Sequence, residues 1–463
     1  MKRIAIALLA FIAVTASAQD TARPNIIVIL ADDLGYGDLS SYGQQLFATP
    51  RLDRMASEGL RFTQFYSGSP VCAPSRCTLI TGHHTGTARI RGNGTQSGQP
   101  VTLYPEDITL AEVLKPAGYA TACIGKWGMG EAGSPGVPNK QGFDYFYGFL
   151  NQRHAHFHYP KMLYRNEEEI TIEGNDPDAQ VGTPAQTLFT EEALKYIRSS
   201  AEKPFFLYLT YTVPHAELSA PANEIASFAG ECFEPETPHV KDHYNAQERP
   251  RAAFAAMVTM LDRDVGRILD LLDELNLSKN TLVLFSSDNG PHHEGGADPV
   301  YFNSNGPLRG IKRDVYDGGV RVPFIARWPG VIAPGKVSPH IGAFWDILPT
   351  CAELTGAETP QNLDGISFAP TLRGDAAHQK QHDYLYWEFF EQGGRQALRA
   401  GDWKGVRMNV LKNQDAPLEL YNLAEDVGEQ HDIAAANPEI AARLRKLMCN
   451  ARTPSEDFVL PNP

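Results

Sequence analysis

The sequence predicts an α/β fold: a large mixed, mostly parallel sheet sandwiched by helices, followed by a small C-terminal α+β subdomain with an antiparallel sheet. Short apolar runs rich in β-branched residues recur along the chain, and amphipathic helical stretches lie between them. This alternation is typical of a parallel sheet that is covered on both faces. Near the C-terminus the pattern changes to short aromatic runs, which predict the antiparallel sheet.

The strands of the large sheet are predicted by apolar runs that are too short for a helix. These runs are residues 25–30, 121–124, 205–209 and 281–285. The clearest helix is predicted over residues 252–275, where apolar side chains repeat near the helical period. Beyond a small, polar stretch at 369–379, the sequence predicts short strands at 384–390, 396–399, 403–407 and 418–421 and a closing helix at 439–447. We therefore expect a main domain over residues 19–372 and a C-terminal subdomain over residues 373–463.

The first 18 residues have the pattern of a cleavable signal peptide. Basic residues at positions 2 and 3 precede an apolar run at 4–14 and a small-residue cleavage site at 16–18. The run is shorter than the about 20 apolar residues that cross a bilayer, and no cysteine for a lipid anchor follows the cleavage site. We therefore expect a periplasmic or secreted protein without a membrane anchor.

The composition limits the partners that the protein can have. The formal net charge of −14 argues against a nucleic-acid partner, because nucleic acids are bound by basic surfaces. It also means that a site for an anion has to be built from local cations. The six cysteines include no C-x-x-C pair, so the sequence indicates neither a zinc ribbon nor a thioredoxin motif, and it assigns no disulfide.

Polar side chains follow each of the predicted buried strands. Ligands of open α/β sheets bind beyond the carboxyl ends of the strands, so we expect these side chains at one rim of the sheet. They are Asp32, Asp33, Lys126, His215, Asp288 and Asn289. The acidic and amide residues offer only oxygen ligands, which predicts Ca²⁺, with Mg²⁺ as the alternative, rather than Zn²⁺. Either acidic pair alone is more typical of capping, whereas two pairs at two strand ends favour a metal.

The most specific motif of the chain is Cys72-Ala73-Pro74-Ser75-Arg76. Pro74 suits the first turn of a helix, so Cys72 is expected at a helix N-terminus. Free N–H groups and the helix dipole favour an anion there. On helix chemistry alone, a structural cysteine is an equally good interpretation.

This motif resembles the signature of the sulfatase family, C-x-P-S-R-x-x-x-L-T-G-R. The sequence matches it at Cys72, Pro74, Ser75, Arg76, Thr81 and Gly82, and departs from it at Ile80 and His83. Other segments are similar to the family's two metal segments (31–38 and 287–290), to the segment with its sulfate-binding lysine (309–323) and to its C-terminal signature (420–423). The resemblance covers nearly the whole chain after the signal peptide.

The resemblance implies an alkaline-phosphatase-like fold, a bound Ca²⁺ and the hydrolysis of sulfate esters. In the family, a maturation enzyme oxidises the motif cysteine, here Cys72, to formylglycine (3-oxoalanine). One hydroxyl of the hydrated aldehyde attacks sulfur, and the other then expels sulfate. The implied metal ligands are Asp32, Asp33, Asp288 and Asn289.

The resemblance also assigns roles to the cations and to one histidine. Arg76, Lys126 and Lys312 are expected to offset the charge of the sulfate and of the transition state. His215 is expected to protonate the departing alcohol. One position departs from the family pattern G-K-W-H-x-G, because the chain has Gly128 where the family has a histidine thought to assist sulfate release.

His154 and His156, in the segment that follows, are candidates to replace this histidine or to bind substrate. An inert surface cluster is an equally good interpretation of them. His292 and His293 directly follow the second metal segment and are therefore expected near the substrate. In the C-terminal subdomain, the side chains of two residues are suited to close a sugar pocket, although packing within a small sheet explains them equally well. They are Glu388 and Arg395.

The variant segment at 125–128 and the stretch at 151–160 resemble those of bacterial sulfatases that act on polysaccharides. This resemblance leads us to expect exo-desulfation of a sulfated galactose or N-acetylgalactosamine unit of a host or algal polysaccharide. The alternatives are a generic arylsulfatase, a phosphatase or phosphodiesterase of the same superfamily, and a non-catalytic binder of sulfated glycans.

Overall fold

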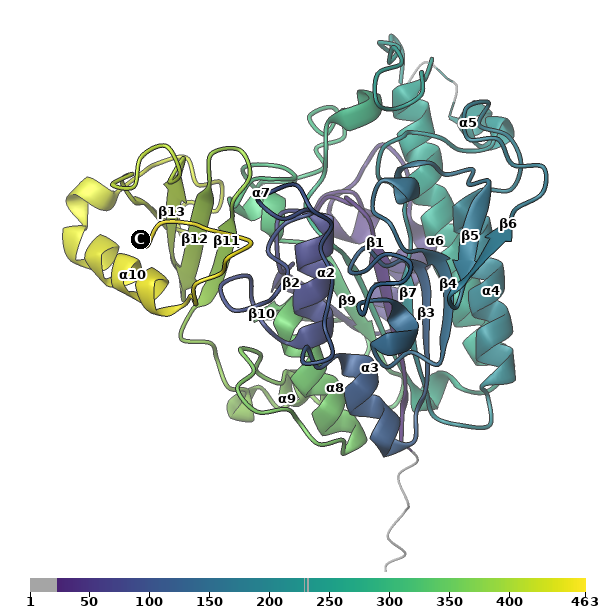
Figure 1. Ribbon diagram of the computed structural model, residues 1–463, viewed down its shortest axis with the longest axis horizontal. Helices are drawn as coiled ribbons and strands as arrows, with labels where there is room; N and C mark the ends of the chain where they lie inside the picture. Colours follow the sequence, from purple (N-terminus) through teal and green to yellow (C-terminus); the bar gives the residue numbers. More distant parts are fainter. Residues whose placement is uncertain (1–22, 229, 231–232) are drawn as a thin grey trace, which may run out of the picture.

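The computed structural model describes residues 23–228, 230 and 233–463. The expected signal peptide and Cys232 therefore lie outside the described residues. Within them, the chain forms one ten-stranded sheet and one four-stranded sheet, which lie beside each other (Figure 1). The α/β fold with a small antiparallel sheet near the C-terminus is confirmed.

The strands of the large sheet lie in the order β10-β2-β9-β8-β1-β7-β3-β4-β5-β6. The central strands β8, β1, β7, β3 and β4 run parallel, β10 runs parallel to β2, and the other pairs near the flanks are antiparallel. The bounds are β1 Asn25–Ala31, β2 Leu60–Tyr66, β3 Ala120–Lys126, β4 Tyr145–Phe149, β5 Met162–Arg165, β6 Glu168–Thr171, β7 Phe205–Thr210, β8 Thr281–Ser287, β9 Phe324–Arg327 and β10 Lys336–Ala343.

Helices cover both faces of this sheet because its central strands are apolar on both faces. Along β1, Ile27 and Ile29 pack into one core with α1, α4 and α6, whereas Val28 and Leu30 pack into a second core with α2, α3 and α8. These helices are α1 Pro50–Ser57, α2 Cys72–Thr81, α3 Leu110–Leu114, α4 Ala185–Ser199, α6 Pro250–Glu274 and α8 Ile347–Thr355. Shorter helices lie in the connections: α5 Ala222–Ser227, α7 Asp317–Val320 and α9 Ala369–Leu372.

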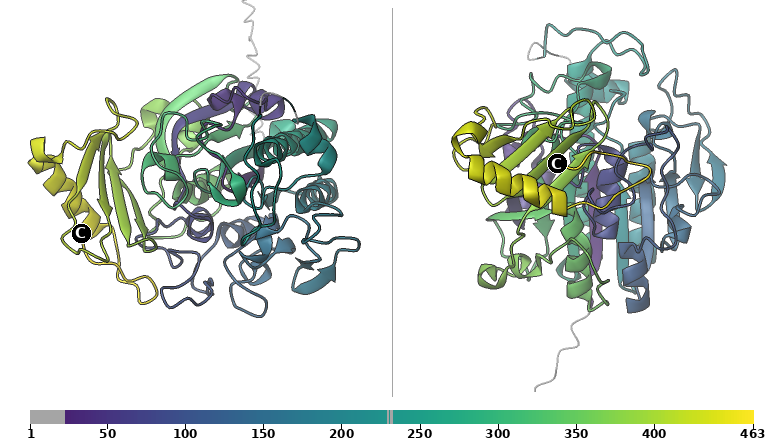
Figure 2. Two further views of the ribbon diagram at one scale, coloured as in Figure 1. Left: turned by 90° about the horizontal axis from the view of Figure 1, so that it is seen from above. Right: turned by 60° about the vertical axis from the view of Figure 1, so that its left-hand side comes forward.

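The small sheet is an antiparallel meander of β11 to β14 that lies between the main body and one helix (Figure 2). One face, with Trp387 and Val406, packs against Tyr66 and Trp345 of the main body. The other face packs against α10 through Leu398, Leu444 and neighbouring apolar residues. The elements are β11 Leu385–Phe389, β12 Arg395–Ala400, β13 Trp403–Met408, β14 Glu419–Asn422 and α10 Pro438–Asn450.

Every strand and helix that the sequence pattern predicts is present, with ends that differ by a few residues. Strands β2, β4, β5, β6, β9 and β10 were not among those expected. No helix in the described ranges has both the length and the apolar character needed to cross a bilayer. The described cysteines carry free thiols; they are Cys72, Cys77, Cys123, Cys351 and Cys449.

Candidate active site

The carboxyl ends of four adjacent strands supply most of the predicted site. In sheet order, the residues are Asp288 and Asn289 after β8, Asp32 and Asp33 after β1, His215 in the loop after β7, and Lys126 at the end of β3. The loops also hold one another, because the backbone N–H of Asp32 donates to Val213 O and that of Asp288 donates to Ala31 O, each at 3.1 Å. Parallel strands thus place these side chains at one rim, as the topology requires.

Cys72 is the first residue of α2, and its Sγ lies 3.4 Å from Oδ1 of Asp32. All ten residues of this helix are buried. The motif residue Ser75 fixes the chain before the helix, since its Oγ accepts a hydrogen bond from Gly68 N at 3.1 Å. The backbone N–H of Ala73, the second residue of the helix, donates to Oδ1 of Asn93 at 2.9 Å.

Arg76 and Lys126 are fully buried cations that tie the helix to the strand ends. Nζ of Lys126 donates to Oδ2 of Asp32 at 2.7 Å. Nε and Nη2 of Arg76 donate to Oδ2 of Asp288 at 3.0 and 2.8 Å, and Nη1 donates to the carbonyl of Lys126 at 2.7 Å. The guanidinium therefore connects α2, β3 and the loop after β8.

Lys312 pairs with Asp33, whereas Lys126 pairs with Asp32. Nζ of Lys312 donates to Oδ2 of Asp33 at 2.7 Å and to Nε2 of His215 at 3.0 Å, and it lies 3.5 Å from Oε2 of Glu294. Glu294 also pairs with Arg313 at 2.8 Å. Burial alone raises the pKa of Glu294, but the charges of Lys312 and Arg313 lower it to about 2. Lys312 is thus the centre of a second, buried charge cluster.

Burial and neighbouring charges set the protonation of the site. Burial and the charge of Asp32 raise the pKa of the Cys72 thiol above its ordinary range. Burial and the charges of Lys312 and Lys126 hold the pKa of His215 well below its ordinary value. Burial and the charge of Asp32 raise the pKa of Asp288 to about 7. The thiol and the imidazole are therefore uncharged near neutral pH.

The acidic and amide side chains are arranged in a way that suits a cation. Nδ2 of Asn289 donates to Oδ1 of Asp33 at 2.7 Å, while the buried Oδ1 of Asn289 has no hydrogen-bond donor among the described residues. Side-chain ligand atoms of Asp32, Asp33, Cys72 and His215 lie within 4.8 Å of one another. A carbonyl oxygen without a donor beside several carboxylates is the ligand set that a hard divalent cation prefers.

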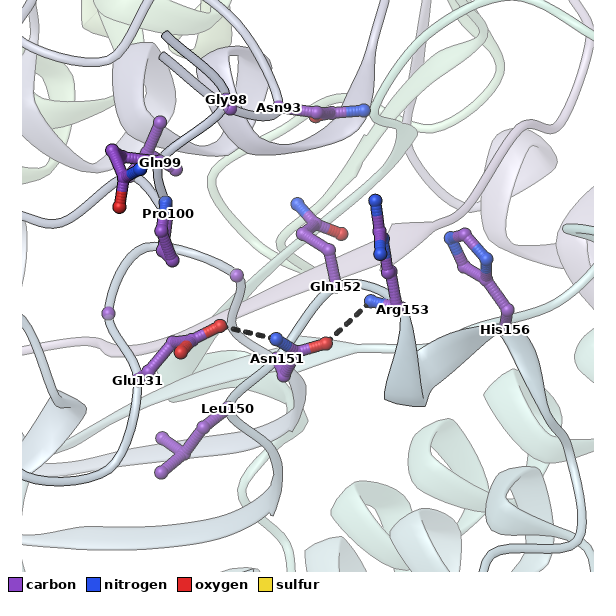
Figure 3. A pocket seen from close by; sticks show the side chains of 14 residues that line it. Asn93, Gly98, Gln99, Pro100, Glu131, Leu150, Asn151, Gln152, Arg153 and His156 are labelled. Carbon is purple, nitrogen blue, oxygen red and sulfur yellow. Dashed lines mark hydrogen bonds between the residues drawn. The ribbon is translucent and has the colours of Figure 1, made fainter.

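A cavity of about 440 Å³ lies beside these groups (Figure 3). Its polar lining includes Asn93, Gln99, Glu131, Asn151, Gln152 and Arg153. Two contacts connect it to the site: Asn93 accepts from the amide after Cys72, and His156 stacks on His215 at 4.7 Å between ring centroids. The lining residue Gly128 also follows Lys126 by two residues in the chain. The cavity is therefore positioned to hold the part of a substrate that adjoins the reacting group.

The four histidines predicted to bind substrate differ in position. His156 stacks on His215 and lines the cavity, and the ring of His292 also stacks on that of His215, at 5.8 Å between centroids. Nε2 of His292 lies 3.1 Å from the carbonyl oxygen of Pro214. His154 packs edge-on against Phe149 at 5.0 Å. The exposed His293 lines a different cavity.

Glu388 and Arg395 are not among the residues that line the cavity beside Cys72. The buried carboxylate of Glu388 accepts from Arg91 at 2.8 Å and from Arg452 at 2.7 Å. Arg395 donates to Oδ1 of Asp314 at 2.6 Å, in the loop that carries Lys312. Both residues thus have charged partners within the protein, and their contact with substrate stays a prediction.

The sequence pattern did not single out three residues of the site. Glu294 follows the second metal segment closely, but nothing in its spacing indicated that it pairs with Lys312. Gln152 lies in the stretch at 151–160, and its residue type alone does not distinguish it from other polar residues there. No sequence pattern around Asn93 indicates a place in the site, because its contact with Ala73 depends on the path of a loop.

Comparisons with known proteins agree with this geometry. The family model described as Sulfatase matches residues 24–357, and one described as N-sulphoglucosamine sulphohydrolase, C-terminal, matches residues 311–453. The chain is 31% identical over 483 residues to N-acetylgalactosamine-6-sulfatase of Homo sapiens, which covers 95% of this chain and 87% of that protein. It is 32% identical over 492 residues to arylsulfatase A of Homo sapiens, covering 94% and 89%.

A solved structure is also similar along the whole chain. The crystal structure of Ps i-CgsB in complex with k-i-k-neocarrahexaose has a TM-score of 0.79, 28% sequence identity and coverage of 95% of each chain. The fold, the charged site at the rim of its sheet and these matches lead to one conclusion. The chain belongs to the sulfatase family, as a type I sulfatase of the alkaline phosphatase superfamily.

Proposed function

We propose that this sulfatase removes sulfate from carbohydrates with a formylglycine nucleophile, formed from Cys72 by a separate maturation enzyme, and with a bound Ca²⁺. One observation carries the proposal: Cys72 at the N-terminus of α2 lies 3.4 Å from a carboxylate, Asp32, whose other oxygen accepts from Lys126 at 2.7 Å. A nucleophile, a metal ligand and a cation thus meet at a single point, beside a cavity with a polar lining.

The state of the Cys72 thiol supports the modification. Burial and the charge of Asp32 raise its pKa, so the thiol stays protonated at neutral pH. The thiolate, not the thiol, is the nucleophilic form of cysteine, so an unmodified Cys72 is inert here. Formylglycine supplies a hydrated aldehyde, with one hydroxyl to attack sulfur and a second to expel sulfate.

The residues proposed to hold the metal fit a calcium ion. The buried carbonyl of Asn289, which accepts no hydrogen bond from the described residues, would be satisfied by a cation. An unsatisfied buried acceptor otherwise costs about 1–3 kcal/mol. The amide carbonyl and the carboxylates of Asp32, Asp33 and Asp288 favour Ca²⁺ over Mg²⁺, because Ca²⁺ accepts more ligands at looser geometry. The bound ion would add positive charge opposite the sulfate oxygens.

The buried cations are proposed to bind and orient the sulfate group. Lys126 pairs with Asp32 and Lys312 pairs with Asp33, so each lysine is held by a different proposed metal ligand. We assign contacts with sulfuryl oxygens to both lysines, and assign Arg76 to holding Asp288 and balancing its charge. We assign the protonation of the departing alcohol to His215, whose Nε2 lies 3.0 Å from Nζ of Lys312.

The cavity supports a carbohydrate substrate. Its amide side chains both donate and accept hydrogen bonds, which matches the hydroxyl groups of a sugar. The relatives include N-acetylgalactosamine-6-sulfatase, and a similar structure was solved with k-i-k-neocarrahexaose. We therefore propose exo-desulfation of a sulfated galactose or N-acetylgalactosamine unit of a host or algal polysaccharide. His154, His156, His292 and His293 remain proposed substrate contacts, together with Glu388 and Arg395.

We also propose a signal peptide and a division of the chain into two domains. We propose that residues 1–18 are a cleaved signal peptide that directs the protein to the periplasm or the outside of the cell. Residues 19–372 would form the catalytic domain and residues 373–463 the C-terminal subdomain. An exported location suits an enzyme that acts on polysaccharides, which do not enter the cell intact.

The test is turnover by protein produced together with a formylglycine-generating enzyme. We expect release of sulfate from at least one member of a panel of galactose 2-, 4- and 6-sulfates and N-acetylgalactosamine 4- and 6-sulfates. Cys72→Ala is expected to lower kcat by about 10³-fold or more, because removal of a nucleophile abolishes covalent catalysis. Cys77→Ala, which removes a buried thiol elsewhere in α2, is the matched control and is expected to retain turnover.

Mass spectrometry of the peptide with residue 72 is expected to show an aldehyde in the active protein and a thiol in protein made without the maturation enzyme. Turnover that survives Cys72→Ala would contradict the proposed nucleophile. Binding of sulfated glycans without turnover of any ester would contradict the proposed reaction.

A further inference from the structure

Gly128, two residues after Lys126, has no room for a side chain. Its backbone is in the left-handed region with φ of +76°, and a Cβ atom built there would lie 2.4 Å from Nε2 and 2.7 Å from Cδ of Gln152. The carboxamide of Gln152 therefore occupies the space that a side chain at position 128 would take. The two segments are held in this relation because Gly128 N donates to Leu150 O at 3.1 Å.

The Gln152 carboxamide is buried but has no hydrogen-bond partner among the described residues, at either Nε2 or Oε1. A carboxamide offers two donor hydrogens and one acceptor oxygen, and leaving such a group unsatisfied costs about 1–3 kcal/mol. The neighbouring Asn151 differs, because its side chain is paired with Glu131 and accepts from Arg153 N at 2.8 Å. Gln152 is thus the amide in this segment whose hydrogen-bonding capacity is not used by the described residues.

The location of Gln152 indicates which part of a ligand it meets. Its side chain lines the cavity and, in Figure 3, extends in the same direction as Arg153 and His156, toward the side on which Asn93 lies. The cations that suit a sulfate group, Lys126 and Lys312, are not among the lining residues. An uncharged amide at this place suits the sugar next to the ester rather than the ester itself.

We propose that Gln152 determines substrate specificity, with its carboxamide hydrogen-bonding to a hydroxyl or acetamido group of the sugar that carries the sulfate. The inference rests on the proposed function and adds to it the residue that distinguishes a sulfated sugar from a simple aryl sulfate. A site that is built to hydrogen-bond a substrate group discriminates against analogues that lack the group, because its own polar atoms are then left unpaired.

The first test replaces Gln152 by methionine, which has similar length but lacks both polar atoms. For the saccharide of the sulfate panel that is turned over fastest, we expect kcat/KM of Gln152→Met to fall about tenfold to hundredfold, the loss that follows from one or two missing hydrogen bonds. For 4-nitrophenyl sulfate, which has no sugar hydroxyls, we expect a change of about twofold or less. Gln45→Met, at an exposed glutamine that does not line the cavity, is the matched control and is expected to leave both values unchanged.

The melting temperature separates a binding role from a structural one. Because Gln152→Met removes two buried atoms without partners, we expect an unchanged or higher Tm. A structural role predicts a lower Tm together with equal losses on both substrates.

The second test uses Gly128→Ala, whose methyl group would push the Gln152 amide out of place. We expect kcat/KM for the saccharide, relative to kcat/KM for the aryl sulfate, to fall by the same factor as in Gln152→Met. In a Gln152→Ala background, Gly128→Ala is expected to leave that ratio unchanged, because the amide it displaces is already absent. Additive losses in the double variant would overturn the proposed link between the two residues.

The outcomes distinguish this inference from the proposed function. Saccharide turnover that is lost with Cys72→Ala but unaltered by Gln152→Met would overturn the role of Gln152 alone. Equal losses on both substrates would indicate that Gln152 acts on the sulfate ester or supports the fold. This outcome would also overturn the inference. A parent enzyme that cleaves the aryl sulfate and none of the saccharides would overturn the carbohydrate proposal, and the inference with it.

Discussion

Arg76, Lys126 and Lys312 are buried, and each is paired with a carboxylate that we propose as a metal ligand. Burying ion pairs costs free energy that good geometry only partly returns, so such a cluster is weak evidence for stability. In this protein the pairing keeps three cations oriented around the point where Cys72 lies. At the scale of single residues, these ion pairs therefore serve the site more than stability, and the site depends on the balance between its cations and its carboxylates.

Asn289→Ala is predicted to weaken Ca²⁺ binding without removing a charge. The substitution takes away the buried carbonyl that lacks a donor, and loss of one ligand is expected to reduce the affinity about tenfold to hundredfold. Titration calorimetry on chelator-treated protein measures the affinity, and the rise of Tm with added Ca²⁺ gives a second readout. Asn223→Ala, at an exposed position in α5, serves as the control; unchanged affinity in Asn289→Ala would exclude the proposed ligand.

Single residues were predictable where a motif carries them. Cys72 and Arg76 are recognisable from their spacing, and Asp32 and Asp288 from their places after buried strands. Gln152 was not predictable, because its position over Gly128 depends on how two loops meet. The contact that assigns it a role is tertiary, and no local pattern encodes it.

At the scale of elements, β11 supports the loop that follows α2 through one buried carboxylate. Glu388 accepts hydrogen bonds from Arg91, in that loop, and from Arg452 near the C-terminus. Arg91 is 3% exposed, so its charge has little access to water. These contacts fit a structural role, which is the alternative to the proposed contact of Glu388 with a sugar.

Glu388→Gln tests these two interpretations. Leaving two buried or half-buried guanidinium groups without their carboxylate is predicted to destabilise the protein by about 3–5 kcal/mol, measured by urea denaturation. Glu425→Gln, at an exposed position, is expected to have little effect. Unchanged stability combined with a fall in kcat/KM for saccharides would instead support the sugar contact.

The elements of the large sheet were predictable to different degrees, for a physical reason. Strands β1, β7 and β8 are buried at every position and appear as continuous apolar runs. Strand β2 mixes buried and half-buried positions, and β6 is largely exposed, so both carry charged residues and lack a clear pattern. Helix α2 is buried all round in spite of its polar residues, because Ser75 and Arg76 find their partners inside the protein.

At the scale of the whole molecule, the C-terminal sheet is joined to the catalytic core by buried charges as well as by apolar packing. Nζ of Lys404, on β13, lies 2.6 Å from Asp317 at the start of α7 and 2.9 Å from Glu429. Burial and the charge of Asp317 raise the pKa of Glu429 to about 7, although Lys404 acts to lower it. Asp317 closely follows Lys312 in the chain, so this contact holds the segment that continues from the Lys312 loop.

Lys404→Met is predicted to destabilise the protein by about 3–5 kcal/mol, since two buried carboxylates lose their cation. Hydrogen exchange is expected to rise in β13 and in the segment around α7, and turnover to fall because the Lys312 loop loses support. The exposed Lys412→Met is the control and is expected to behave as the parent. Faster exchange in β13 alone would show that the small sheet does not support the site.

The convergence of strand ends at one rim could be predicted, because it follows from parallel topology. The docking of the small sheet could not, since it depends on contacts between residues far apart in the chain, such as Arg395 with Asp314. The sequence pattern therefore predicted both units and gave no account of how one supports the other.

The burial of α2 has a consequence for the timing of the proposed oxidation of Cys72. Cys72 is 2% exposed, and the helix that it begins is enclosed on all sides. If Cys72 is oxidised as proposed, the oxidising enzyme needs a cysteine it can reach, so it would have to act before this helix is enclosed. On that proposal, a molecule that folds first would keep its thiol and remain inactive, and the active fraction of a preparation would reflect the competition between oxidation and folding.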